Sequence, residues 1–160
     1  MAPAWSLTFS GALLAAGLFA STERPAFGEE VLSAEGETPD IRVEIRDLKR
    51  DGDGTVTLRV RLVNDSTESF DHDCGMRDDD FSDACETFSG AYLLDAANKK
   101  KYLVVRDSEK KCVCGDIADL EPGKKVNVWA TYPAPPAEVV KVTVVVPLFE
   151  PIEGVPVTGP

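Results

Sequence analysis

The chain has 160 residues, of which 43% are hydrophobic. This length supplies one well-buried domain and is too short for two of ordinary size. The formal net charge of −11 argues against nucleic acid and anionic membrane surfaces as partners, because both attract Lys and Arg. We therefore expect one acidic, soluble domain.

An apolar run at residues 5–20 opens the chain. It has the length of a secretory signal peptide and is shorter than the ~20 residues that a helix needs to span a bilayer. Residues 1–20 are therefore predicted to be a signal peptide, although residues 1–6 contain no Lys or Arg. Cleavage after Ala20 or after Gly28 fits the preference for small residues, and an uncleaved anchor is the alternative. Export predicts a secreted, extracellular protein, free or associated with the cell envelope, with no membrane insertion after processing.

Residues 21–40 are acidic and contain several Pro and Gly, with six carboxylates and a single Arg. A segment of this composition cannot bury much apolar surface. We expect a flexible acidic linker that ends where the first strand begins at Ile41.

Alternation of apolar and polar residues begins at Ile41. Residues 41–45 and 56–62 alternate with period two, which predicts two strands with one buried face each, and Asp51-Gly52-Asp53-Gly54 predicts a turn between them. The turn superficially resembles an EF-hand calcium loop. Alignment of Gly54 with the EF-hand glycine places Lys49 and Val60 at the first and last ligand positions, where acids must stand, so that reading fails.

Four further segments carry strand patterns, at residues 92–94, 102–105, 126–132 and 140–146. The proline-rich tail after Val146 is expected to pack along the domain without forming another regular strand. Strands of this kind need a second sheet to bury their apolar faces. The fold class predicted for residues 41–157 is therefore all-β, an immunoglobulin-like antiparallel β-sandwich of about seven strands.

Four cysteines in a chain predicted to be exported indicate disulfides rather than free thiols. Cys74 and Cys85 lie eleven residues apart and can close a loop on themselves, which leaves Cys112 and Cys114 to bridge across one residue. If residues 112–114 are extended, both of their side chains leave from the same face and can instead reach Cys74 and Cys85. The sequence leaves both arrangements open.

Residues 71–86 carry the densest charge in the chain, with seven carboxylates and one Arg. Such packing is repulsive unless a cation enters, and hard oxygen ligands suit calcium. One hypothesis is therefore a calcium site, or a site for another metal, with the ligands Asp71, Asp73, Asp78, Asp80 and Asp83. The alternative is a solvated loop whose charges keep a sheet edge from pairing with neighbouring molecules.

His72 is the only histidine of the chain. Together with Cys74, Cys112 and Cys114 it could complete a zinc or copper site, but oxidised cysteines cannot serve as ligands. The chain contains no Gly-x-Ser-x-Gly nucleophile motif and no phosphate-binding glycine loop. We therefore expect no enzyme activity.

Several short stretches resemble a known family. They are Leu-Val-Asn-Asp-Ser at residues 62–66, residues 102–106 leading into Cys-Val-Cys at 112–114, Leu-Glu-Pro-Gly at 120–123 and Tyr-Pro-Ala-Pro-Pro at 132–136. Over residues 41–157 the chain resembles the immunoglobulin-like domain of exported actinobacterial proteins, which is often fused to an OmpA-like peptidoglycan-binding module, and it is similar to the DUF4352 group of secreted β-sandwiches. The resemblance implies a secreted sandwich and brings no catalytic residues.

These observations predict a secreted, non-catalytic β-sandwich that binds a protein or a cell-envelope component through its loops or an exposed sheet face. Fold, export and the lack of a catalytic motif motivate this prediction. The alternative is a secreted metal-binding domain that uses residues 71–86.

Overall fold

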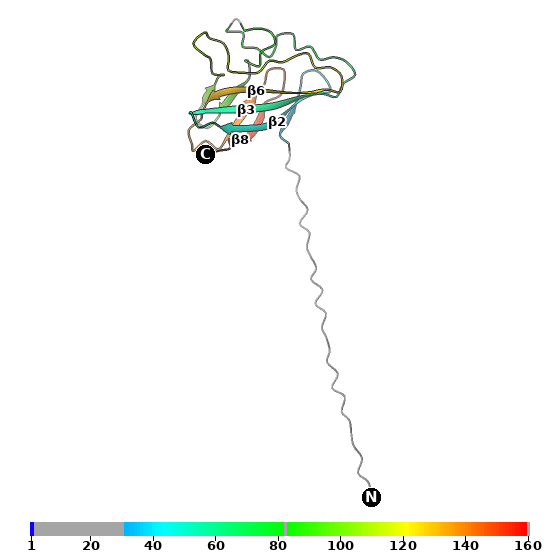
Figure 1. The fold of residues 1–160 in the computed structure, drawn as a ribbon, viewed down its shortest axis with the longest axis vertical. Helices are drawn as coiled ribbons and strands as arrows, with labels where there is room; N and C mark the ends of the chain where they lie inside the picture. Colours follow the sequence, from blue (N-terminus) through cyan, green and yellow to red (C-terminus); the bar gives the residue numbers. More distant parts are fainter. Residues whose placement is uncertain (2–30, 82, 160) are drawn as a thin grey trace.

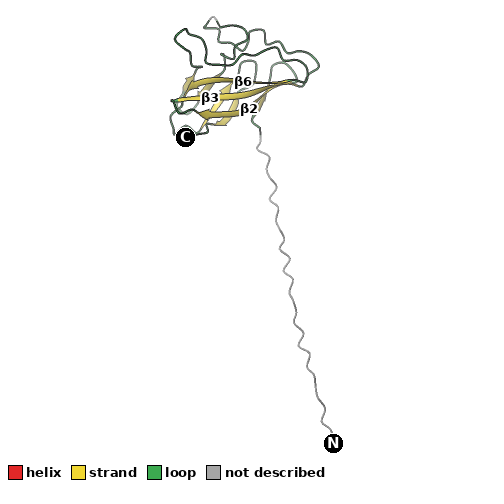
Figure 2. Ribbon diagram, viewed as in Figure 1, coloured by secondary structure: helices red, strands yellow, loops and turns green. Residues whose placement is uncertain are grey.

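A computed structural model describes residue 1, residues 31–81 and residues 83–159 (Figure 1). The predicted signal peptide and the first part of the predicted linker lie outside the described residues, apart from Met1. Within the described part, every regular element is a β-strand, as Figure 2 shows. This part of the chain contains no helix that is both long and apolar enough to cross a membrane.

Eight strands form two four-stranded antiparallel sheets. The first sheet has the order β1 (Ser33–Glu35), β2 (Ile41–Arg50), β3 (Thr55–Asn64), β6 (Lys125–Pro133). The second has the order β5 (Lys100–Tyr102), β4 (Tyr92–Asp95), β7 (Lys141–Val145), β8 (Ile152–Pro156). The apolar inner faces of the two sheets meet in one core, which confirms the predicted β-sandwich.

Seven of the strands follow the immunoglobulin order with one exchange. In constant-type immunoglobulin domains, strands A, B, E and D form one sheet and C, F and G form the other. Here β2, β3 and β6 correspond to A, B and E, and β4, β7 and β8 correspond to C, F and G. The remaining strand, β5, takes the place of D in the chain order but pairs with β4 instead of β6. It therefore belongs to the opposite sheet. The edge of β6 is thereby left for other segments to cover.

Strand β3 forms the centre of the core. Val56, Leu58, Val60 and Leu62 are fully buried, as their period-two spacing predicts. Removing four such side chains from water contributes on the order of 6 to 10 kcal/mol before chain entropy is subtracted. Because successive side chains of a strand point to opposite faces, the residues between these four point to the outward face of the first sheet.

A β-bulge interrupts strand β2. The register with β3 shifts between Ile45 and Asp47, so that Arg46 is the extra residue. On either side of the shift, Val43 and Leu48 both point into the core and are buried. The bulge thus places Arg46 and Asp47 next to each other on the outward side of the sheet, where both line the same surface pocket.

Part of the segment predicted to be a linker is strand β1. Ala34 pairs with Val43 and is buried, whereas Ser33 and Glu35 on either side of it are exposed. Edge pairing satisfies the backbone of β2 without burying any of the acidic side chains. The prediction of a flexible segment up to residue 40 is therefore wrong for residues 33–35.

The proline-rich tail also contains a strand that the sequence analysis did not predict. β8 pairs with β7 and buries Ile152 and Val155, while Gly154 between them has a positive φ. Pro156 is tolerated because it is the last residue of an edge strand.

The strand predicted at residues 102–105 is displaced. β5 ends at Tyr102, and the backbone N–H of Val105 donates to the carbonyl of Thr131 in β6, at 2.8 Å. The chain therefore crosses from the second sheet to the edge of the first within three residues.

Candidate functional site

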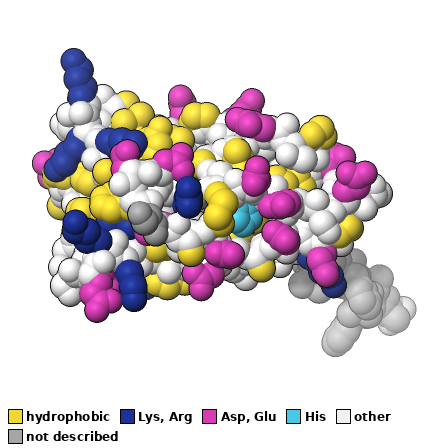
Figure 3. Space-filling model, turned by 90° about the horizontal axis from the view of Figure 1, so that it is seen from above, with side chains coloured by type: hydrophobic (Ala, Val, Ile, Leu, Met, Phe, Trp, Pro, Cys, Tyr) yellow, Lys and Arg dark blue, Asp and Glu magenta, His cyan; other side chains and the backbone are white. Residues whose placement is uncertain are grey.

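The acidic loop, residues 71–86, belongs to the long connection between β3 and β4. It is pinned at both ends, since Phe70 pairs with Leu120 and Thr87 pairs with Asp116. Figure 3 views the loop-bearing side of the molecule, where acidic side chains are dense over one half and most Lys and Arg side chains lie toward the other. Because Met76 and Phe88 are fully buried, the connection is anchored in the core.

Both disulfides are local. Cys74 bonds with Cys85 and Cys112 bonds with Cys114, which settles the two arrangements left open by the sequence. The first bond closes the acidic loop on itself. The second spans a single residue in the connection between β5 and β6.

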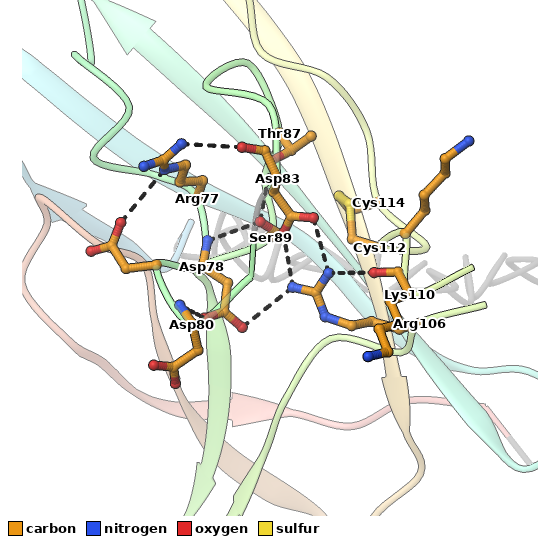
Figure 4. Close-up of polar contacts among 12 residues, drawn as sticks. Arg77, Asp78, Asp80, Asp83, Thr87, Ser89, Arg106, Lys110, Cys112 and Cys114 are labelled. Atoms are coloured by element: carbon orange, nitrogen blue, oxygen red, sulfur yellow. Dashed lines mark hydrogen bonds and ion pairs between the residues drawn. A yellow bond between two sulfur atoms is a disulfide. The ribbon is translucent and has the colours of Figure 1, made fainter. Parts of the chain in front are cut away.

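Arg106 lies at the centre of the polar contacts of the acidic loop (Figure 4). Its two terminal nitrogens donate to the two carboxylate oxygens of Asp83, at 2.8 and 2.9 Å. One of them also lies 3.4 Å from Asp78 Oδ2, and the other donates to the carbonyl of Lys110 at 2.8 Å. The guanidinium stacks on the ring of Phe81, with Cζ 3.5 Å from its centroid. This fork-to-fork geometry is the strongest form of Arg–carboxylate pairing.

The pair is largely withdrawn from solvent. The side chains of Arg106 and Asp83 are 12% and 9% exposed. The hydrogen bond from Arg106 holds the pKa of Asp83 below its ordinary value, and the same contact raises the pKa of Arg106. Both groups therefore stay charged across the physiological range.

The five carboxylates proposed as metal ligands do not converge. Asp78 and Asp83 come together, but on Arg106 rather than on a shared cation position. Asp71 accepts the backbone N–H of Asp73, and Asp80 donates its backbone N–H to Asp78. Across residues 31–81 and 83–159, no three His, Cys, Asp or Glu side chains are grouped so that they could hold a metal ion. The described residues therefore hold no preformed ligand set of this kind, and the calcium hypothesis stays a prediction.

His72 also departs from the metal hypothesis. It is 6% exposed, and its Nδ1 has no hydrogen-bond partner among the described residues. The cysteines considered as its co-ligands are joined in disulfides. A thiolate site of the zinc type is thus not available to it.

A second cluster lies on the outward face of the first sheet. The strand register places Asp47, Arg59 and Trp129 in one row across β2, β3 and β6, and it places Arg61 beside Asn127 in the next row. Together with Arg46 at the bulge, these side chains line a shallow pocket of about 470 Å³. We call this surface the Trp129 face and define it by six residues: Arg46, Asp47, Arg59, Arg61, Asn127 and Trp129.

Positive charge predominates on the Trp129 face, although the whole chain carries −11. Arg59 pairs with Asp47 at 2.9 Å, and Arg61 donates to the amide oxygen of Asn127 at 3.2 Å. Arg46 has no ion pair within the described part of the chain. Three guanidinium groups thus surround the pocket with one carboxylate, and Glu44 lies 3.9 Å from Arg61 at its margin.

Trp129 is held from one side. Its side chain is 41% exposed, while its backbone carbonyl accepts the N–H of Gly115 at 2.8 Å. A Cβ at Gly115 would lie 3.1 Å from Cδ1 and Nε1 of the indole, so the ring packs directly on the glycine backbone. The absence of a side chain at residue 115 lets the indole lie close against the chain.

Sequence reasoning missed both Arg106 and the Trp129 face. Arg106 is distant in sequence from Asp83, and nothing local marks the pair. A signal for the face was present, because Arg59 and Arg61 alternate with the core residues of β3, and Trp129 alternates with those of β6. Placing them on one surface required the pairing order of the strands.

No family model, curated protein or solved structure matches the chain.

Proposed function

We propose that the protein is a secreted, non-catalytic binding module whose Trp129 face holds an acidic polysaccharide of the cell envelope. The observation that carries this proposal is a partly exposed tryptophan, fixed against Gly115 and surrounded by arginines, in an otherwise acidic protein. The two disulfides are compatible with the oxidising compartment that export implies.

The chemistry of the Trp129 face, in contrast to the net charge of the whole chain, matches an acidic sugar polymer. The flat indole offers an apolar surface on which the C–H side of a pyranose ring can stack, and Asn127 adds an amide that can bond to hydroxyl groups. Guanidinium groups pair with carboxylates or phosphates through two hydrogen bonds. Arg46 is exposed and not committed to an ion pair within the described chain, so it is available to such a group.

The backbone around the face disfavours an extended peptide as the occupant. A peptide that added itself to the sheet beside Trp129 would need the free edge of β6, the strand that carries Trp129. That edge is occupied, because Thr131 bonds to Val105 and to Val113, and Trp129 bonds to Gly115. Recognition on this face must therefore come from side chains, which suits a polymer of sugar rings.

The test is binding of the purified chain to a soluble acidic polysaccharide, with polygalacturonate as the probe and neutral dextran as the reference, measured by affinity electrophoresis. We expect retention by the acidic polymer alone. Trp129→Ala should weaken retention about tenfold or more, as loss of a central aromatic contact does. Arg46→Gln should weaken it less and reduce its salt dependence.

Val140→Ala is the matched control, since Val140 is a 64% exposed apolar residue outside the Trp129 face and should leave retention unchanged. Equal retention of the wild type and Trp129→Ala by the acidic polymer would contradict the proposal. So would the absence of any retention, and binding to an acidic peptide in place of the polysaccharide would reassign the class of partner.

A further inference from the structure

The two disulfides differ in how much chain they constrain. Cys74 and Cys85 are separated by eleven positions, whereas Cys112 and Cys114 are separated by two. A bond that closes a larger loop removes more entropy from the unfolded chain. Folding and disulfide reduction form one thermodynamic cycle, so a disulfide that stabilises the fold more is itself harder to reduce in the folded protein. The small Cys112–Cys114 ring is therefore the easier of the two to reduce.

The Cys112–Cys114 ring lies on the edge of β6, directly beside Trp129. The N–H of Val113 donates to the carbonyl of Val105, and the carbonyl of Val113 accepts the N–H of Thr131, at 2.8 and 3.0 Å. Cys114 forms a bridge with Ala130, and Gly115, the next residue, supports the indole. The ring therefore fixes the segment on which the tryptophan rests.

The ring is partly open to solvent and partly packed against the core. Both cysteines are half-buried, and the exposed Lys110 and Lys111 precede them. Lys111 pairs with Glu109 at 3.2 Å, while Lys110 has no ion pair among the described residues. Cationic side chains in the same segment favour the approach of an anionic thiolate, which is the attacking species in disulfide exchange.

We propose that Cys112–Cys114 is a reversible thiol–disulfide exchange site for external dithiols, and that its redox state sets the packing of Trp129. The proposal concerns chemistry that the binding function does not require. It stands whether or not the Trp129 face takes a polysaccharide.

The exchange is balanced by the dithiol itself. One of its thiolates attacks a sulfur of the ring, a mixed disulfide forms, and the Cys112–Cys114 bond breaks to release the other cysteine as a thiolate that takes up a proton. The second thiolate of the reagent then attacks its own sulfur in the mixed disulfide, and the remaining cysteine leaves and is protonated. The dithiol loses two electrons and two protons, and the cysteine pair gains them.

The test treats the Trp5→Phe chain, in which Trp129 is the sole tryptophan, with graded dithiothreitol and then traps free thiols with N-ethylmaleimide. Peptide mass spectrometry reports which cysteines are labelled, and tryptophan emission is read before trapping. We expect Cys112 and Cys114 to be labelled at a dithiothreitol concentration about tenfold or more below that needed for Cys74 and Cys85. The emission should shift to longer wavelength in step with this first labelling.

Cys112→Ser/Cys114→Ser in the same background is the control. Its tryptophan emission should match that of the reduced chain and should not change when dithiothreitol is added. Simultaneous labelling of all four cysteines would overturn the exchange site. Labelling of Cys112 and Cys114 without a change in emission would overturn the link to Trp129. Both readouts come from the chain with native cysteines, so they do not depend on the serine variant folding.

Discussion

The acidic loop and the Trp129 face differ in whether their charged side chains are paired and buried or exposed to solvent. In the loop, Asp78 and Asp83 are neutralised by Arg106 from the connection between β5 and β6, and Arg106 is itself shielded by Phe81. On the face, Arg46 is exposed and has no ion pair among the described residues, and Arg59 and Arg61 lie beside a partly exposed tryptophan. The region with the densest charge in the sequence thus makes its strongest contacts with another segment of the chain, and the region with an ordinary strand pattern leaves Arg46 and part of Trp129 exposed.

The difference shows that charge density alone does not identify a ligand site. A buried carboxylate must find a partner when the chain folds, and here a distant arginine supplies it. Charged side chains on the outward face of a sheet remain in water, so they do not need a partner within the fold. Each of the following changes acts on one region and leaves the other as its reference.

The largest effect is expected from removal of the disulfide inside the acidic loop, and the disulfide beside the Trp129 face is its comparison. Cys74→Ser/Cys85→Ser should lower the free energy of unfolding by about 3 kcal/mol, and Cys112→Ser/Cys114→Ser by about 1 kcal/mol, because the first closes the longer loop. Urea denaturation of both double variants measures the two losses. Equal losses, or a larger loss for Cys112 and Cys114, would refute the division into a stabilising and an exchangeable bond.

Arg106→Met should destabilise the protein by about 2 to 3 kcal/mol, since it leaves Asp83 and Asp78 without their shared cation. Lys111→Met removes an exposed ion pair with Glu109 and should cost less than about 0.5 kcal/mol. Urea denaturation at pH 7 compares the two. A loss below 0.5 kcal/mol for Arg106→Met would show that the loop does not depend on this contact.

The same pair predicts a pH dependence. Because Arg106 holds the pKa of Asp83 below its ordinary value near 3.8, its stabilisation is fully present above that value and is lost as the pH falls through the lower, folded value. The gap in unfolding free energy between wild type and Arg106→Met should therefore shrink by about half or more between pH 4 and pH 2. A gap that stays constant over this range would contradict the assignment.

Calcium should have the smallest effect. With Asp78 and Asp83 committed to Arg106, millimolar calcium or a chelator should move the melting temperature by less than about 1 °C. Differential scanning calorimetry with and without calcium measures this. A clear calcium-dependent rise, abolished by Asp80→Asn, would restore the metal hypothesis for the acidic loop.

Local patterns in the sequence were enough for the fold class. Period-two alternation in β2, β3, β6 and β7 depends only on which side chains enter the core, and a hairpin turn with Gly54 at positive φ joins β2 to β3 as predicted. The missed strands β1 and β8 are edge strands, whose formation depends on backbone groups left open by a neighbour rather than on their own side chains. The prolines and acidic residues in these segments therefore gave no alternating pattern from which the strands could be predicted.

The candidate site was less accessible to sequence reasoning, because each of its parts depends on long-range pairing. Arg106 reaches Asp83 only after β5 ends and the chain crosses to the edge of β6. Trp129 joins Arg59 only through the register of β3 with β6, and Arg46 joins both only through the bulge in β2. The alternation within β3 and β6 puts Arg59, Arg61 and Trp129 on outward faces, but it does not show that these faces belong to neighbouring strands.

The measurement that tests the central claim most directly is an NMR titration of the ¹⁵N-labelled chain with oligogalacturonate. We expect the largest shifts on the Trp129 face, at the indole N–H of Trp129 and at the backbone amides of Arg46, Arg59 and Asn127, with no comparable shifts in residues 71–86. Shifts concentrated in the acidic loop, or none on the Trp129 face, would contradict it.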